Sequence, residues 1–234
     1  MTCGPELGGD IHPELVCADR LFPGDGTELR NATIRIAGGR IAEIGSFDPT
    51  CPPDGALRSP IVAPGFIDIQ INGACDVQFN ESPGVAAIEA IVRGARRGGT
   101  AHVLPTFITA PGRSYAAAID AVRAARGMPG VLGLHLEGPF LNPERRGVHE
   151  PASMRPVDDD DLELLIGFDA GRLLLTLAPE CQPPGTIRRL TEAGVIIFAG
   201  HSAATGREMA AAIGEGLTGA THLFNAMGSV AQIE

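Results

Sequence analysis

VLGLHLEGPFLNPERRGVHEP, residues 131–151, is the stretch around which the rest of the chain is organised. An apolar run leads into a His-x-Glu pair, and a Gly-Pro break follows at once. Because buried parallel strands are near-continuous apolar runs that end at turn residues, this pattern predicts a buried strand with Glu137 at its C-terminal tip. A buried carboxylate is costly unless it meets a cation or a hydrogen-bond donor. Glu137 is therefore a candidate site residue.

A strand-then-helix rhythm continues on both sides of this stretch, from Ile61 onward. Apolar runs alternate with Ala-rich segments of helical period, which is typical of βα units around a parallel sheet. The predicted strands are residues 66–72, 102–107, 131–137, 173–178, 195–199 and 219–224, and the predicted helices are residues 84–97, 114–125, 158–165, 184–193 and 204–215. These repeats favour an α/β fold, a TIM-like (β/α)8 barrel in residues 61–234 with six of the eight strands present. We expect the barrel to be C-terminally incomplete and the 234-residue chain by itself to lack useful activity.

Residues 1–60 have a different pattern. Short β-like runs at 32–36 and 40–44 are separated by Gly-Gly, Pro-Gly and Pro-Pro pairs, which predicts a small antiparallel, sandwich-like β module. Gly38 and Gly39 are expected to form a hairpin turn, because tight hairpin turns need positive φ.

Composition excludes several classes of protein. With 18 basic and 28 acidic residues the net charge is −10, which argues against nucleic acid or an anionic membrane as partner. No apolar run reaches the roughly 18 residues of a membrane span, and the N-terminus lacks a signal-peptide pattern, so we expect a cytoplasmic protein. The five cysteines are scattered without a CxxC pair, and we expect reduced thiols. The acidic run at 158–161 is expected to begin a helix rather than to bind calcium.

Polar residues mark the predicted strand ends. Glu137 ends the third strand, His201 follows the fifth and His222 lies on the sixth. Taken singly, each histidine is more often a core or capping residue. Because a barrel brings its strand ends together, the three side chains can share one coordination sphere. A carboxylate with two imidazoles suits a divalent ion, zinc or ferrous iron, and leaves positions open for water.

Five motifs together resemble one known family. They are PGFIDIQING at 64–73, HLEGPFLNPERRGVHEP at 135–151, LAPE at 177–180, GHSAAT at 200–205 and ATHLFNAM at 220–227. In order and spacing they resemble the N-acetylglucosamine-6-phosphate deacetylase family of the amidohydrolase superfamily. The resemblance implies a metal-dependent hydrolase that releases acetate from an amino-sugar phosphate, and a homodimer in the full-length form.

The same resemblance implies roles for individual residues. Glu137, His201 and His222 would hold the catalytic metal, and one ion is expected because Gln70 and Asn72 replace the His-x-His of many amidohydrolases. The backbone of Val148 and the side chain of His149 would contact the amino sugar, with His149 orienting or polarising the acetamide carbonyl. The backbone around Asn225 and Ala226 would lie near the phosphate.

Two features depart from the family pattern. The family's acid-base Asp lies at the end of the eighth strand, beyond the end of this chain; Asp68 is a weak substitute for which we expect a structural role. Ile233 occupies the position of a phosphate-binding Arg, and an apolar side chain cannot make those charge-assisted bonds. Arg145 and Arg146 are possible phosphate donors, or solvated surface. An amidohydrolase for another N-acyl compound, or a non-catalytic fragment, therefore remain as alternatives.

Overall fold

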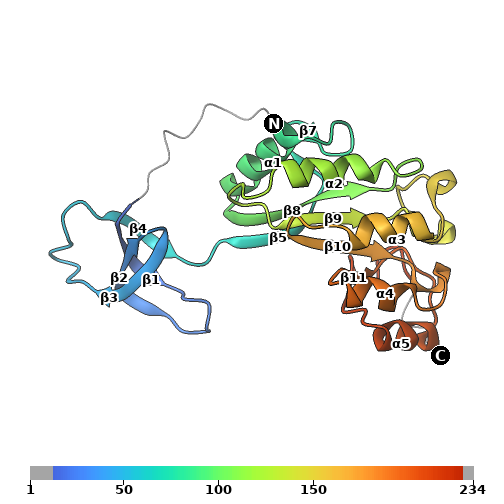
Figure 1. Ribbon diagram of the computed structural model, residues 1–234. Coiled ribbons are helices and arrows are strands. Elements are labelled where there is room, and N and C mark those ends of the chain that lie inside the picture. The colour runs from blue at the N-terminus through green and yellow to red at the C-terminus, as the bar shows by residue number, and fades with distance from the viewer. Residues whose placement is uncertain (1–12, 229–234) are drawn as a thin grey trace. The chain divides into compact units, whose positions relative to one another are not determined.

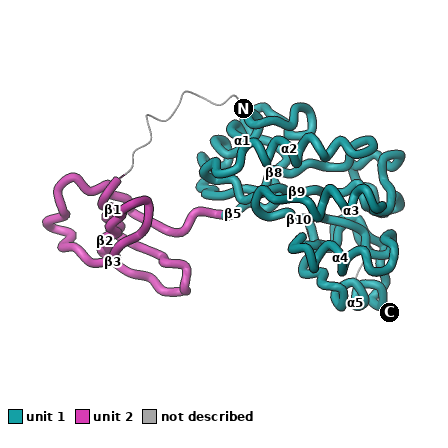
Figure 2. The backbone as a smooth tube through the Cα atoms, in the orientation of Figure 1, with its two compact units in different colours: residues 1–3, 67–234 teal, residues 4–66 magenta. Residues whose placement is uncertain are grey.

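The computed structural model describes residues 13–228, which divide into two compact units between Phe66 and Ile67 (Figure 2). The smaller unit consists of the residues before this point, and the larger unit consists of the residues after it. Each unit has a sheet and an apolar core of its own.

The smaller unit contains a four-stranded sheet in the order β3-β2-β1-β4. Its strands are β1 (Leu15–Leu21), β2 (Leu29–Ala37), β3 (Arg40–Ser46) and β4 (Leu57–Val62). The hairpin prediction is confirmed, since Gly38 and Gly39 join β2 to β3 with φ of 56° and 71°. The antiparallel prediction holds for β1, β2 and β3 but is wrong for β4, which pairs parallel with β1.

The larger unit contains a six-stranded sheet in the order β12-β11-β10-β9-β8-β5. Its strands are β5 (Phe66–Ile71), β8 (Thr100–Ile108), β9 (Gly133–Glu137), β10 (Arg172–Leu177), β11 (Ile196–Ala199) and β12 (Gly219–Ala220). The strands from β8 to β12 pair in parallel. The sheet curls as part of a (β/α) barrel does, and the helices lie along it (Figure 1).

Five α-helices connect these strands, close to the predicted positions. They are α1 (Val85–Arg97), α2 (Tyr115–Ala124), α3 (Asp159–Ile166), α4 (Thr186–Glu192) and α5 (Gly206–Gly214). Two of them begin at a reciprocal capping box, in which the cap side chain and the third helical residue each accept a backbone N–H: Asp158 with Asp161, and Thr205 with Glu208. The acidic run at 158–161 therefore begins a helix, as predicted.

Strand β9 positions the site because all five of its residues are buried. Side chains alternate between the two faces of a strand. Leu134 and Leu136 belong to the apolar core shared with the helices, while His135 and Glu137 lie on the other face. That second face is polar, since His135 contacts threonines of β8 and β10. The carboxylate of Glu137 therefore lies inside the curl of the sheet.

The predicted sixth strand, residues 219–224, is too long. β12 ends at Ala220, and His222, Phe224 and Ala226 all have positive φ, of 33°, 68° and 51°. Left-handed backbone cannot continue a strand. His222 thus lies in the turn after β12 rather than on the strand.

Short elements surround the strand ends. A small hairpin joins β6 (Gly73–Ala74) to β7 (Val77–Gln78), and 3-10 turns form η1 (Pro143–Arg145), η2 (Pro151–Ser153) and η3 (Pro179–Cys181).

Two further expectations concern reduced cysteines and the absence of a membrane-spanning segment. The expectation of reduced thiols is wrong for Cys75, which is disulfide-bonded. Spacing in the sequence does not reveal this, because pairing depends on how close two Cα atoms lie in the fold. Among residues 13–228, no helix combines the length and hydropathy that crossing a membrane requires.

Candidate metal centre

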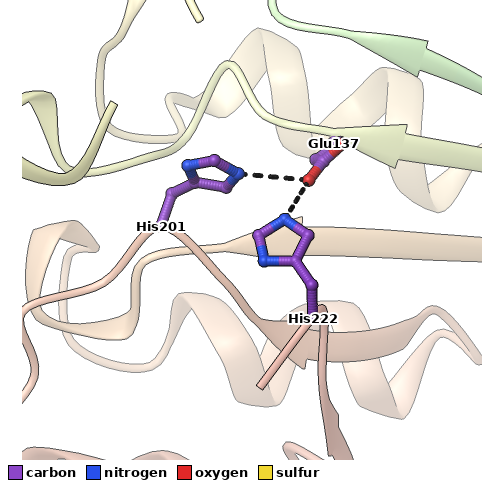
Figure 3. Close-up of side chains that lie close together, drawn as sticks. All are labelled: Glu137, His201 and His222. Atoms are coloured by element: carbon purple, nitrogen blue, oxygen red, sulfur yellow. Dashed lines mark hydrogen bonds and ion pairs between the residues drawn. The ribbon is translucent and has the colours of Figure 1, made fainter. Parts of the chain in front are cut away.

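Three side chains predicted to form the site meet at one carboxylate oxygen (Figure 3). The Nε2 atom of His222 lies 2.9 Å from Oε1 of Glu137, and that of His201 lies 3.2 Å from the same oxygen. The possible ligand atoms of the three residues all lie within 4.8 Å of one another. Glu137 and His201 are buried, and His222 is partly buried.

Backbone carbonyls hold both imidazoles by their other nitrogen. Nδ1 of His201 lies 2.8 Å from the carbonyl oxygen of Arg145, and Nδ1 of His222 lies 3.2 Å from that of Asn225. A carbonyl only accepts, so Nδ1 carries a proton in each ring and Nε2 is left to face Glu137. Such outer hydrogen bonds are typical of metal-bound histidines. The donor set, two imidazole nitrogens and one carboxylate oxygen, therefore fits a divalent ion such as zinc or iron.

The backbone of both histidines is in the left-handed region, with φ of 49° at His201 and 33° at His222. A non-glycine residue in this region costs of order 1–3 kcal/mol and persists where its surroundings hold it. Such strain is concentrated at functional sites.

The electrostatics of the cluster favour an ionised Glu137. Burial would raise the pKa of this carboxyl, but the Nε2 atoms of His201 and His222, which donate to it whenever they carry a proton, lower its pKa to about 2. Burial opposes the charged form of His201, yet its bonds to Glu137 and to the Arg145 carbonyl raise its pKa overall. The pKa of His149 is lowered to about 4 by burial and by the neighbouring His201.

His149 lies beside this cluster and is also buried. Its Nε2 is 3.9 Å from Oε1 of Glu137, and its ring centroid is 4.4 Å from that of His201. Nδ1 lies 2.8 Å from the hydroxyl of Thr109, which follows β8. Sequence reasoning missed Thr109, although its place just past a predicted strand was a usable signal.

The position after Glu137 requires glycine. The φ of Gly138 is 81°, and a Cβ there would lie 2.2 Å from Oγ1 of Thr109. A side chain at this position would therefore displace the hydroxyl that holds His149.

The four residues predicted to contact substrate line the same hollow as the cluster. This hollow has a volume of about 570 Å³, and its lining includes Val148, His149, Asn225 and Ala226 together with Glu137, His201 and His222. Val148 is 89% exposed, so its backbone is accessible from solvent. Gln70 and Asn72 also line the hollow.

Gln70 contacts Glu137 directly, whereas Asp68 contacts the backbone of Gln70. The side-chain amide of Gln70 donates to Oε2 of Glu137 at 3.0 Å, so Gln70 orients the carboxylate. The carboxylate of Asp68 accepts the backbone N–H of Gln70 at 3.0 Å, a local contact. Asp68 is not part of the described lining of the hollow, and its structural role stays a prediction.

A buried chain of hydrogen bonds lies beneath the cluster. Nδ1 of His135 is 3.1 Å from the hydroxyl of Thr106, which also donates to the carbonyl of Leu104. Nε2 of His135 is 2.8 Å from the hydroxyl of Thr176, and that hydroxyl is 2.6 Å from the hydroxyl of Thr221. Burial lowers the pKa of His135 to about 4. The ring is thus neutral near pH 7 and tied to two neighbouring strands.

The possible phosphate donors lie elsewhere. Arg145 lines a different hollow, beside Leu223 and Phe224, and Arg146 is exposed. Ile233 lies outside the described residues.

The sequence profile of the amidohydrolase family matches residues 61–233, which includes every residue of this site. The chain belongs to the amidohydrolase family. Members of this family generally use a divalent metal, and the cluster of this amidohydrolase offers a place for one.

Two relatives with assigned functions illustrate how far the similarity extends. An N-acetylgalactosamine-6-phosphate deacetylase of Shewanella sp. (strain ANA-3) is 39% identical over 78% of this chain and 47% of its own length. The human N-acetylglucosamine-6-phosphate deacetylase is 38% identical over 71% of this chain and 43% of its own. The chain thus spans about half the length of these relatives.

Solved structures agree on the fold. The N-acetylglucosamine-6-phosphate deacetylase of Pasteurella multocida superposes with a TM-score of 0.81 at 30% identity, covering 93% of this amidohydrolase and 59% of that chain. A Mycobacterium smegmatis deacetylase in complex with N-acetyl-D-glucosamine-6-phosphate gives the same TM-score at 31% identity, over 93% and 57%. The prediction of a partial (β/α)8 barrel with a separate small sheet is confirmed.

Proposed function

We propose that this chain carries the metal-dependent active site of an N-acetylglucosamine-6-phosphate deacetylase, which releases acetate and glucosamine 6-phosphate. The observation that carries this proposal is the convergence of His201 and His222 on Glu137, in a hollow that His149 also lines. Similarity to deacetylases of two phosphorylated N-acetylhexosamines supports the substrate class.

The side chains divide the work between metal and substrate. Glu137, His201 and His222 would hold one divalent ion, zinc or ferrous iron. Such an ion lowers the pKa of a bound water toward ~7 and polarises the amide carbonyl. Gln70 orients the carboxylate of Glu137 through Oε2. When the hydroxyl of Thr109 donates to Nδ1 of His149, Nε2 of the neutral ring carries the proton and can donate it to the acetamide oxygen.

A second candidate function has an observation in its favour. The described residues that line the hollow include neither arginine nor lysine. Phosphate is usually met by charge-assisted hydrogen bonds, whereas the donors that line this hollow include neutral side-chain amides such as those of Asn72 and Asn80. The second candidate is therefore an amidohydrolase for an N-acyl compound without phosphate.

Acetate release separates these candidates. The protein would be purified at its native length, established by mass spectrometry, and loaded with zinc or ferrous iron. N-acetylglucosamine 6-phosphate, its galactosamine epimer and unphosphorylated N-acetylglucosamine would then be compared. Preference for a phosphorylated sugar, with one ion per chain that is lost in His201→Ala and His222→Ala, is the expected result. Preference for the unphosphorylated sugar supports the second candidate, and no acetate release from any of the three contradicts the proposal.

The expected homodimer and the expected cytoplasmic location stay predictions. Light scattering on the native-length protein tests the first, and cell fractionation tests the second.

A further inference from the structure

Glu180, the last residue of the LAPE motif, belongs neither to the metal cluster nor to the described lining of the hollow. It lies on η3, directly after β10, and is partly buried. Its carboxylate accepts three hydrogen bonds: Oε1 from the side-chain amide of Asn142 at 2.9 Å and from the backbone N–H of Ala203 at 2.6 Å, and Oε2 from the hydroxyl of Ser202 at 2.7 Å. One carboxylate therefore joins two segments that are far apart in the sequence.

Both segments hold His201. Ser202 and Ala203 directly follow it in the chain. Asn142 donates its backbone N–H to the carbonyl of His201 at 3.0 Å and caps η1, whose last residue Arg145 accepts from Nδ1 of His201. Glu180 thus secures the backbone of His201 on one side and the turn that orients its ring on the other.

The backbone of His201 needs such support. Its φ of 49° is unfavourable for a residue with a side chain, so the conformation persists only where neighbouring contacts maintain it. Two hydrogen bonds of His201, from the Asn142 N–H to its carbonyl and from its Nδ1 to the Arg145 carbonyl, involve a segment that Glu180 holds.

We propose that Glu180 is a positioning residue that holds His201 in the orientation required to ligate a divalent metal ion. This inference rests on the proposed metal centre. Glu180 touches neither substrate nor metal, and acts through Asn142, Ser202 and Ala203.

Zinc affinity of the native-length protein, measured by competition with a chromophoric chelator, provides the main test. In Glu180→Ala the three donors lose their acceptor, and zinc affinity is expected to fall about 10–100-fold, as is usual when a hydrogen-bond partner behind a metal ligand is lost. Glu180→Asp keeps the charge but cannot reach both segments, so its affinity is expected to lie between those of Glu180→Ala and the wild type.

Glu215→Ala is the matched control. Glu215 is also a partly buried carboxylate that joins two segments, since it accepts the backbone N–H groups of Gly185 and Arg188 at the start of α4. It contacts none of the segments around His201, so its loss is expected to leave zinc affinity unchanged. Equal weakening in both alanine variants would mean general destabilisation and would overturn the proposal. Unchanged affinity in Glu180→Ala would also overturn it, as would unchanged affinity in Glu180→Asp if the alanine variant does not fold.

A metal-free measurement separates this inference from the proposed function. The Asn142 amide proton bonds the His201 carbonyl, so its hydrogen exchange reports whether the two segments stay together. Protection of this amide is expected to fall in Glu180→Ala and to stay in Glu215→Ala. If the wild type binds no zinc, the proposed metal centre fails, while loss of this protection still identifies Glu180 as the residue that positions His201. Retained protection in Glu180→Ala overturns the inference in either case.

Discussion

Two buried carboxylates in the larger unit, Glu137 and Asp161, differ in the charge of their neighbours. Asp161 is fully buried and meets Arg113, Arg155 and the hydroxyl of Tyr115, with the Tyr115 bond at 2.7 Å and the Arg113 bond at 3.1 Å. Glu137 is 3% exposed and meets histidines and the amide of Gln70. Arginine is always charged, whereas imidazole is largely neutral near pH 7.

The difference separates a structural carboxylate from a functional one. Two guanidinium groups, which also pair with the exposed side chain of Asp158, meet the charge of Asp161 within the protein. The rings around Glu137 present Nε2 to its carboxylate and balance its charge only when they are protonated, so with neutral rings, as in a metal ligand set, the balancing charge would come from a bound cation. Burial and a lowered pKa are common to both carboxylates, so neither property alone identifies a site.

The largest expected effect is on metal binding, which should be lost when Glu137 is changed and kept when Asp161 is changed. Glu137→Gln should abolish tight metal binding, because it removes a ligand and its charge. The loss should exceed the ~10–100-fold that removal of a partner behind a ligand costs. Asp161→Asn should bind metal with wild-type stoichiometry when folded. Metal analysis after dialysis measures both, and equal retention in the two variants would invalidate the comparison.

Asp161→Asn should instead affect stability. Removing one partner of a buried ion pair costs up to ~3–5 kcal/mol, and the cost here is expected below that limit, because Arg113 and Arg155 keep Asp158 as a partner. Asp169→Asn is the matched control, since Asp169 also pairs with two arginines, Arg123 and Arg126, but is exposed. Exposed pairs are worth only ~0–1 kcal/mol. Urea unfolding gives both values, and a similar cost in the two variants would show that burial of Asp161 does not matter.

His149, next to Glu137, is expected to serve the substrate rather than the metal. In His149→Ala the metal should stay, while turnover should fall ~10²-fold or more, as for loss of one polarising donor. Acetate release together with metal analysis tests this. Loss of the metal along with activity would make His149 a ligand.

The smallest expected effect is a pH dependence that belongs to Asp161. Burial would raise its pKa, but the hydrogen bonds from Arg155 and from the backbone of Asp158 lower it to about 2, below the ordinary value of 3.8. A carboxyl with a lowered folded-state pKa stabilises the protein above its unfolded-state pKa and loses that contribution as pH falls toward its folded-state pKa. The stability gap between wild type and Asp161→Asn should therefore narrow between about pH 4 and pH 2. Urea unfolding across this pH range measures the difference in unfolding free energy between the two proteins. A difference that stays constant would show that the contribution of Asp161 does not depend on its charge.

The strands and the donors at their tips could be predicted, because apolar runs that stop at Gly-Pro or before a histidine are local signals. Glu137 was placed at the end of β9 on this basis. The position of His222 was wrong, because its left-handed backbone depends on contacts around the turn rather than on residue type. Asp158 was identified at the start of a helix, but the burial of Asp161 three residues later was not. Which face of a short helix meets Arg113 and Arg155 is set by the packing of other elements. Glu180 was missed for the same reason, since its partners lie far away in the sequence, whereas the place of Thr109 just past a predicted strand was a usable signal.

Donor and acceptor roles along the chain of hydrogen bonds through His135 depend on one another. When the hydroxyl of Thr106 donates to the carbonyl of Leu104, it accepts a hydrogen bond from Nδ1 of His135. A neutral ring with its proton on Nδ1 accepts at Nε2, so Thr176 donates to it and in turn accepts from Thr221. In this arrangement every proton in the chain points toward β8, and no hydroxyl can reverse alone. A valine at Thr176 would leave Nε2 of His135 without its partner and separate Thr221 from the chain, whereas a valine at Thr221 would remove only the last donor.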